Sequence, residues 1–201
     1  SASKQLASCK MLDVNYRNIP RNNNPATIGF SNEPLDIYDT PLIHAADVNN
    51  CNIIDIIINH PSFDQEKSGI NQAIAISIKR DNNEIFKKLI NIKDLSINTF
   101  EYNNTKLFKL ILDSRSGKIF SDLLDNPDFK PSKDEIQMAF SQIYTFNTNN
   151  ILQLLTKLCN YVKDHKDIID FKKCLPNGKS FFTSILRINM LNIEGIVNQL
   201  L

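Results

Sequence analysis

The sequence is poor in features that mark several large classes of protein. Only 5 of its 201 residues are glycine, tryptophan is absent, and the four cysteines form no Cys-x-x-Cys pair. This spacing suggests neither a disulfide framework nor a zinc knuckle, so we expect reduced thiols. The longest apolar runs, such as residues 53–58 with Asp55 inside, fall short of the roughly 18 residues of a membrane-spanning helix. We therefore expect no membrane insertion.

An excess of charge of one sign is also lacking. The chain has 23 Lys and Arg against 22 Asp and Glu, a net charge of +1. This balance supplies no broad cationic field for nucleic acid or anionic lipid. Hydrophobic residues make up 42% and charged residues 22%, values typical of a folded chain with a real core. We expect a cytoplasmic globular protein that binds no nucleic acid.

A repeat with a period of about 33 residues is present in the middle of the chain. Ile53, Ile54, Ile57 and Ile58 follow the spacing i, i+1, i+4, i+5, which makes one apolar stripe on a short helix. Similar stripes recur in residues 84–90 and 118–124. Pro127 follows Pro61 at a distance of two such periods. The pattern predicts a repeated second helix.

Each copy is predicted to form a helix-turn-helix hairpin. The first half of a copy carries small residues such as Ala45 and Ala46, where a second helix can approach closely. Polar turns separate the halves at residues 49–50, 81–83 and 114–117. Thr40 before Pro41 is suited to begin the first helix, because its hydroxyl can cap free amides and proline is tolerated at the first position. Isolated Ile-rich segments favour strands, so these helices depend on packing.

These residues resemble the ankyrin repeat. The resemblance rests on Thr40-Pro41-Leu42, on Ala45-Ala46, on the Ile-rich second helix and on the period, and covers about residues 36–129. It implies an all-α fold, an ankyrin-repeat solenoid of stacked helix-turn-helix units with finger loops.

The sequence departs from the ankyrin pattern at two places. The histidine usual directly after Leu is replaced by Ile43, and His44 comes one residue later, so packing should hold this repeat more than hydrogen bonds do. The glycine of the inter-helix turn is replaced by Cys51 or Asn83, and asparagine tolerates a left-handed conformation. His60, before Pro61, is expected at a helix end, where a partly cationic ring suits the helix dipole.

We predict one ankyrin-repeat domain, residues 1–201. Its parts are a partial upstream repeat at 1–16, a loop insertion at 17–34, repeats at about 36–66, 68–100 and 101–131, a divergent repeat at 132–175 and a terminal one at 176–201. The insertion is inferred from spacing, because the segment from Asn15 to Thr40 is more than three times as long as the equivalent segment from Asn98 to Thr105. It is predicted to lie in the loop that would normally form a short hairpin finger.

Three patterns that resemble chemical sites are weak. Gly178-Lys179-Ser180 ends like a phosphate-binding loop, but Lys173 stands where that motif needs glycine. Cys159, His165 and Cys174 have irregular spacing for zinc ligands. A nucleophilic pair of Cys51 and His44 lacks an orienting third group. We therefore predict no catalytic residue, no metal and no cofactor, and the chain is not expected to be an enzyme.

The resemblance implies a partner-binding surface made by finger residues and the exposed end of each first helix. Its residues by motif position are Asp36, Ile37, Tyr38, Asp39, Asp47, Val48, Ser68, Asn71, Lys79, Arg80, Glu101, Tyr102, Asn104 and Asp113. Tyr38, Tyr102 and Arg80 are preferred as hot spots, because Tyr and Arg often dominate interface energetics. A local basic cluster of Lys79, Arg80, Lys87 and Lys88 is either a solvated helix face or a contact for an acidic partner.

The function expected from this surface is binding of a partner protein. A stacked array of this kind has no enclosed pocket for a reaction, but it lines an extended concave face. We therefore predict a protein-interaction module. The alternative is a regulatory or targeting segment of a larger multidomain enzyme or effector.

Overall fold

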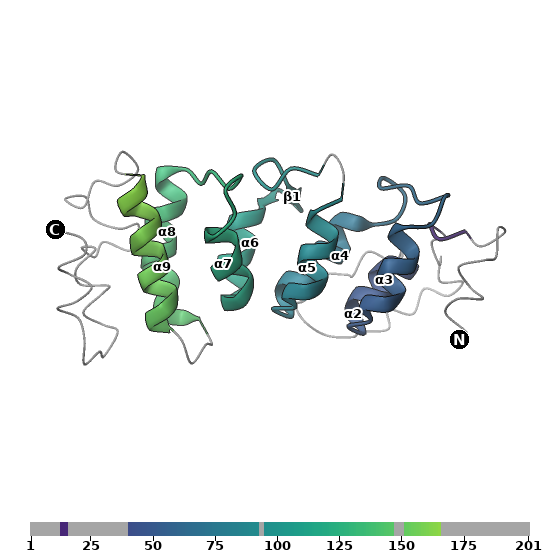
Figure 1. The fold of residues 1–201 in the computed structure, drawn as a ribbon, viewed down its shortest axis with the longest axis horizontal. Coiled ribbons are helices and arrows are strands. Elements are labelled where there is room, and N and C mark those ends of the chain that lie inside the picture. The colour runs from purple at the N-terminus through teal and green to yellow at the C-terminus, as the bar shows by residue number, and fades with distance from the viewer. Residues whose placement is uncertain (1–12, 16–39, 93–94, 147–150, 166–201) are drawn as a thin grey trace. The chain divides into compact units, whose positions relative to one another are not determined.

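The computed structural model describes residues 13–15, 40–92, 95–146 and 151–165. The described residues contain eight α-helices, one 3₁₀ turn and one two-stranded hairpin, which confirms the all-α prediction (Figure 1). The predicted insertion at 17–34 and the terminal repeat at 176–201 lie outside the described residues. None of the described helices is both long and apolar enough to cross a membrane.

The chain divides into two compact units. The first comprises Ser1–Ser77 and Glu84–Lys93, and the second comprises Ile78–Asn83 and Asp94–Leu201. The division falls near the end of one helix, so that its last two residues are grouped with the following turn. Each unit is described separately below.

The first unit begins its described helices at the predicted cap. Helix α2 (Pro41–Asp47) starts after Thr40, whose hydroxyl accepts the N–H of Ile43 at 3.3 Å, and Pro41 occupies the first turn. Helix α3 (Cys51–Ile58) packs against α2 and buries Ile54 and Ile57. The first helix of the predicted hairpin therefore begins directly after the predicted capping residue, Thr40.

The next hairpin of the first unit is joined to α2 through the same threonine. It consists of α4 (Ile70–Lys79) and α5 (Asn83–Ile90). The Thr40 hydroxyl donates to the carbonyl of Ser68, just before α4. Gly69 between them has φ +73°, and a Cβ there would lie 2.6 Å from Cδ1 of buried Ile43. Glycine is required here by both backbone conformation and space.

The second unit stacks two helix hairpins in two layers. Helices α6 (Leu107–Ser114) and α8 (Lys133–Gln142) contact each other, as do α7 (Gly117–Leu124) and α9 (Ile151–Asp164). A 3₁₀ turn, η1 (Ile143–Thr145), follows α8 and contacts both α8 and α9. First helices thus pack on first helices and second helices on second helices.

Aromatic rings fill the interior of the second unit. The ring centroids of Phe108 and Phe120 lie 5.7 Å apart, and those of Phe120 and Phe146 lie 5.4 Å apart. Phe129 lies 5.3 Å from Phe108 and 6.1 Å from Tyr161. The contacts link α6, α7 and α9 with the intervening loops, so the core runs through both hairpins.

Helix α9 extends beyond the segment predicted to be helical. The apolar pattern indicated residues 150–155, with residues 158–175 as an extended connection that is partly helical. The observed helix continues to Asp164 because Leu158, Cys159 and Val162 continue its buried face. Most of the described part of that connection is therefore helical.

A left-handed residue lies in each of the three inter-helix turns that the structure describes in full, α2–α3, α4–α5 and α6–α7. Asn49, Asp81 and Arg115 have φ of 56°, 49° and 58°. The predicted positions, Cys51 and Asn83, were wrong, because each is the first residue of its second helix and adopts helical geometry. The reversal of the chain is completed before the second helix begins, which moves the left-handed residue two positions earlier.

Two asparagines form equivalent clamps, one in each unit. The side-chain amide of Asn15 donates to the carbonyl of Ser62 at 2.7 Å, and its oxygen accepts the N–H of Asp64 at 3.0 Å. Asn98 bonds the carbonyl of Asp128 and the N–H of Lys130 in the same way, at 2.7 and 2.9 Å. The acceptor loops are two repeat periods apart, as the two prolines predicted.

The spacing of the two clamps differs. Asn15 and Asp64 are 49 residues apart, whereas Asn98 and Lys130 are 32 apart. The difference between these two sequence separations is close to the number of residues in the proposed insertion at 17–34.

His60 follows the C-cap of α3, and its ring bonds to the loop that comes next. Its Nδ1 accepts the N–H of Ser62 at 3.2 Å and lies 2.7 Å from the Ser62 hydroxyl. The expected role of His60 beside the helix dipole stays a prediction.

The Asn98 clamp should contribute measurably to stability. Replacing Asn98 with alanine removes two hydrogen bonds to backbone groups, and we expect the free energy of unfolding to fall by about 1–2 kcal/mol. Urea unfolding followed by circular dichroism measures the change. Asn160→Ala, at an exposed position inside α9, is the matched control and should not destabilise. Equal stability of the Asn98 variant and the control would contradict the clamp.

Candidate protein-binding surface

The surface residues predicted in the first unit differ in exposure. Val48, the C-cap of α2, is 52% exposed, and Asp47 before it is half-buried. Asn71 is exposed in the first turn of α4. Ser68 is fully buried next to Thr40, whereas the sequence predicted that its side chain would belong to the partner-binding surface. The predicted residues 36–39 lie outside the described residues.

The second unit carries a short hairpin directly before α6. Strands β1 (Glu101–Tyr102) and β2 (Thr105–Lys106) are antiparallel, with Tyr102 opposite Thr105. Asn103 and Asn104 between them have φ of 50° and 58°, the conformation of a two-residue type I′ turn. A short hairpin thus lies at the place where the resemblance predicts a finger.

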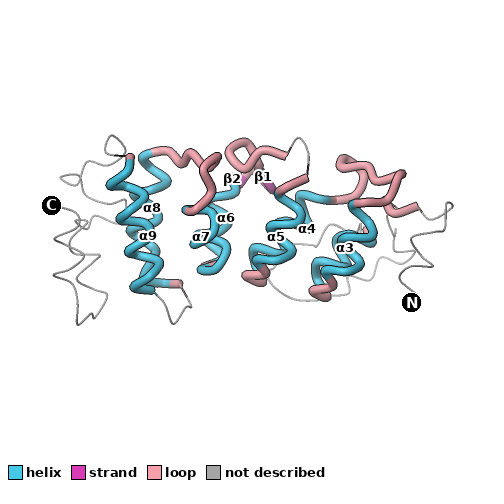
Figure 2. Tube along the Cα trace, viewed as in Figure 1, coloured by secondary structure: helices cyan, strands magenta, loops and turns pink. Residues whose placement is uncertain are grey.

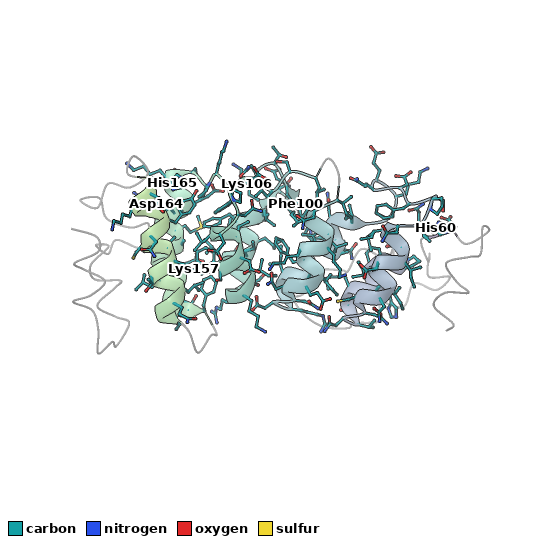
Figure 3. All side chains as sticks on the ribbon, in the orientation of Figure 1. His60, Phe100, Lys106, Lys157, Asp164 and His165 are labelled. Atoms are coloured by element: carbon teal, nitrogen blue, oxygen red, sulfur yellow. The ribbon has the colours of Figure 1, made fainter. Side chains whose placement is uncertain are left out.

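The hairpin is held at its base and exposed at its tip. Phe100 is buried, and its carbonyl accepts the N–H of Leu107 at 3.1 Å. Glu101 and Asn104 are exposed, and Tyr102 is half-buried. Figure 3 shows Phe100 and Lys106 at the two ends of this segment. A fixed backbone therefore presents polar side chains and part of a tyrosine ring.

The other predicted residues of the second unit lie at the opposite end of α6. Asp113 is near the C-terminal end of α6 and is ion-paired with Lys109 at 2.7 Å. Figure 2 shows the hairpin and the α6–α7 turn at opposite ends of this helix. Eight helical residues span about 12 Å. The predicted surface of this unit thus consists of a finger region and a separate turn region.

The turn region is held together by hydrogen bonds between successive turns. The carboxylate of Asp81 accepts the N–H groups of Lys118 and Ile119 at 3.1 and 3.2 Å, which caps the first turn of α7. The buried hydroxyl of Ser116 donates to the carbonyl of Ile78. Lys79 and Arg80, which lie between Ile78 and Asp81, are thereby placed beside the turn at residues 115–118.

Sequence reasoning missed two residues of this region. Arg115 and Lys118 are exposed and adjoin the bonds that connect the turns. Periodicity identified both turns as polar. It gave no indication that Ser116 bonds to Ile78, 38 residues away, or that Asp81 bonds to Lys118, 37 residues away. The available signal was an aspartate followed, at this distance, by a Gly-Lys helix start in which Gly117 is buried and Lys118 is exposed.

The four-residue basic cluster predicted from the sequence is divided between the two units. Lys88 pairs with Asp55 at 2.8 Å in the first unit, and this hydrogen bond raises the pKa of Lys88. Lys87 is exposed on α5 in the same unit. Lys79 and Arg80 belong to the second unit. The charge of Lys88 is therefore compensated within its own unit.

The described cysteines are placed for packing. Burial raises the pKa of Cys159 to about 12, and burial followed by a hydrogen bond with Glu84 raises the pKa of Cys51. Both thiols therefore stay protonated near neutral pH. Of the predicted zinc set, Cys159 is buried and His165 places Nδ1 2.8 Å from the carbonyl of Tyr161, while Cys174 lies outside the described residues.

No group of three His, Cys, Asp or Glu side chains in the described residues is arranged to hold a metal ion. His44, considered as a partner of Cys51, is exposed on α2.

No protein-family model, curated protein or solved structure matches this chain.

The Cys159 thiol should react slowly in the folded protein. Its pKa of about 12 lies three above the ordinary 9.0, so the thiolate fraction at pH 8 falls about a thousandfold. Because the raised pKa favours the neutral form in the folded state, ionisation of Cys159 opposes folding as pH rises above 9.0.

Alkylation by iodoacetamide at pH 8 measures this in a variant with Cys9, Cys51 and Cys174 replaced by serine. The rate in buffer should be at least a hundredfold below the rate in urea. Similar rates in both conditions, with the fold intact by circular dichroism, would contradict the burial of Cys159.

Proposed function

We propose that the chain is a protein-interaction module of the ankyrin-repeat type, which binds a partner protein through its finger hairpin and the neighbouring ends of its first helices. The observation that carries the proposal is the hairpin at residues 101–106. It has an ordered type I′ turn, a buried base at Phe100 and an exposed polar tip.

A preorganised hairpin suits binding for an energetic reason. Ordering a loop on binding costs free energy, and a turn that is already fixed lowers that cost. The half-exposed Tyr102 supplies a large, rigid contact surface of the kind that is enriched in interface hot spots. Exposed Glu101 and Asn104 flank it and can form the polar rim.

The ankyrin assignment has separate support. Left-handed residues recur at matching positions of the three inter-helix turns, and first and second helices form separate layers in the second unit. The clamps by Asn15 and Asn98 recur with the same partners in equivalent loops. These features are typical of a helical repeat with a period of about 33 residues.

Hairpin variants test the proposed function. The chain with a photoreactive cross-linker at Asn104 is used to identify a partner from cell extract, and binding of the purified partner is then measured by calorimetry. Tyr102→Ala should weaken that binding at least tenfold, because hot-spot truncations cost about 2 kcal/mol or more. Lys163→Ala, an exposed change on α9, is the control and should leave binding unchanged.

Circular dichroism of both variants establishes that they are folded. A cross-linked partner whose affinity is the same for wild type, Tyr102→Ala and Glu101→Lys would show that the hairpin does not bind it. The absence of any specific cross-linked protein would also contradict the proposal.

A further inference from the structure

Helix α3 differs from α5 and α7 in the burial of one apolar position. The three helices have 8 residues each, and the fourth and seventh residue of each is apolar and buried. The third residue is Ile85 in α5 and Ile119 in α7, and both are 0% exposed. In α3 the third residue is Ile53, which is 39% exposed. An isoleucine whose counterparts are buried is therefore uncovered in α3.

A second isoleucine of α3 adjoins Ile53. Ile56 follows it by three residues, which places both on one face of the helix, and Ile56 is half-buried. We define the α3 edge as Ile53 and Ile56. The position equivalent to Ile56 in α5 holds Lys88. The α3 edge is thus apolar at a position where α5 carries a charge.

The α3 edge faces away from α5. Lys88 donates to both carboxylate oxygens of Asp55 in α3 at 2.8 Å, so its side of α5 is the side toward α3. Asp55 lies about 130° around the helix from the midpoint of Ile53 and Ile56, because an α-helix has 3.6 residues per turn. The α3 edge therefore corresponds to the side on which α5 meets the helix before it, and the residues that cover it should precede α3 in the chain.

The chain before α2 is already attached to the first unit at residues 13–15. Val14 is 1% exposed, and the Asn15 side chain clamps Ser62 and Asp64 in the loop that follows α3. Residues 1–12, which lie outside the described residues, directly precede this attachment. They are grouped in the same compact unit as α3.

We propose that residues 1–12 cover the α3 edge, through the apolar side chains of Leu6 and Met11. This inference goes beyond the proposed function and does not depend on it. Ile53 lies at most about 20 Å from Ser62, which is six helical steps and three extended ones. The nine residues from Leu6 to Asn15 can span up to about 30 Å. The clamp therefore leaves the segment long enough to reach the edge.

The small size of the α3 edge favours a segment of the same chain over a free partner. Two isoleucine side chains, one of them half-buried, offer far less than the roughly 800 Å² that each partner buries in a stable interface. A free protein or a second copy would bind such an edge with a dissociation constant of about millimolar or weaker. A segment tethered by the clamp has an effective concentration of about millimolar, so it can occupy the edge.

Alkylation of an introduced cysteine tests the coverage in the full chain. Ile53→Cys and, separately, Val48→Cys are made with Cys9, Cys51 and Cys174 replaced by serine. The rate with iodoacetamide in buffer is divided by the rate of the same variant in urea. Val48 is 52% exposed at the C-cap of α2 and serves as the reference. Coverage should make the relative rate at position 53 at least tenfold lower than at position 48.

Substitutions within the segment identify what covers the edge. Leu6→Ser with Met11→Ser should raise the relative rate of Ile53→Cys at least fivefold. Gln5→Ser with Lys10→Ser, at polar positions of the same segment, is the matched control and should leave it unchanged. Val48→Cys should react equally in both backgrounds, since unfolding would raise both rates and loss of coverage raises one.

The proposal fails if the relative rates at positions 53 and 48 are similar, because the α3 edge would then be open. It also fails if Leu6→Ser with Met11→Ser leaves the protection of Ile53→Cys intact, since another segment would then cover the edge. Protection that grows over a hundredfold increase in chain concentration would assign the edge to a second copy.

Discussion

Hydrogen bonds between successive turns are the constraint on which the described structure of the second unit depends. Asp81 caps the first turn of α7, and Ser116 satisfies a carbonyl at the end of α4. Helices α6 and α7 have eight residues each, and helices this short are marginal when isolated in water. Contacts with the neighbouring turn therefore supply hydrogen-bond partners for backbone groups at helix ends, which have no partner within their own helix.

Packing and polar contacts act on different parts of each repeat. Apolar residues of α6, α7 and α9 fill the interior, with aromatic rings linking both hairpins. The clamps by Asn15 and Asn98 fix the outer loops, where backbone groups are exposed. Packing favours association in general, whereas the polar bonds select one register because their donors and acceptors must meet at about 3 Å.

The same constraint positions the surfaces that are available for binding. The hairpin begins after buried Phe100 and leads directly into α6, so its tip moves with that helix. The turn region adjoins the bonds that connect two turns. Both surfaces are therefore fixed by contacts that also hold the fold together. This lowers the free-energy cost of ordering them when a partner binds.

The sequence predicted the helices well because their signals are local. The Thr40 cap, the apolar stripes and the polar turns each depend on residues within one or two helical turns, and the helices begin within a few residues of the predicted positions. The left-handed positions were misplaced because several polar residues in each turn could accept that conformation. Asn49 and Asp81 are two residues before the predicted sites.

The candidate surface was less predictable because it depends on contacts between repeats. Ser68 has a polar side chain and a loop position, yet the bond from Thr40 draws it into the interior. Lys88 resembles a solvated cation until Asp55, 33 residues earlier, is seen to pair with it. Arg115 and Lys118 join Lys79 and Arg80 only through bonds that span 37 to 38 residues.

Replacement of Asp81 by glycine tests the central claim most directly. Glycine suits the left-handed backbone at φ 49°, so the backbone alone predicts equal or greater stability. Loss of the two bonds to α7 instead predicts a decrease of about 1–2 kcal/mol in the free energy of unfolding in urea. Arg115→Gly, at a left-handed position without this capping role, should gain about 0.5–1 kcal/mol. An Asp81→Gly protein as stable as the wild type would contradict the account.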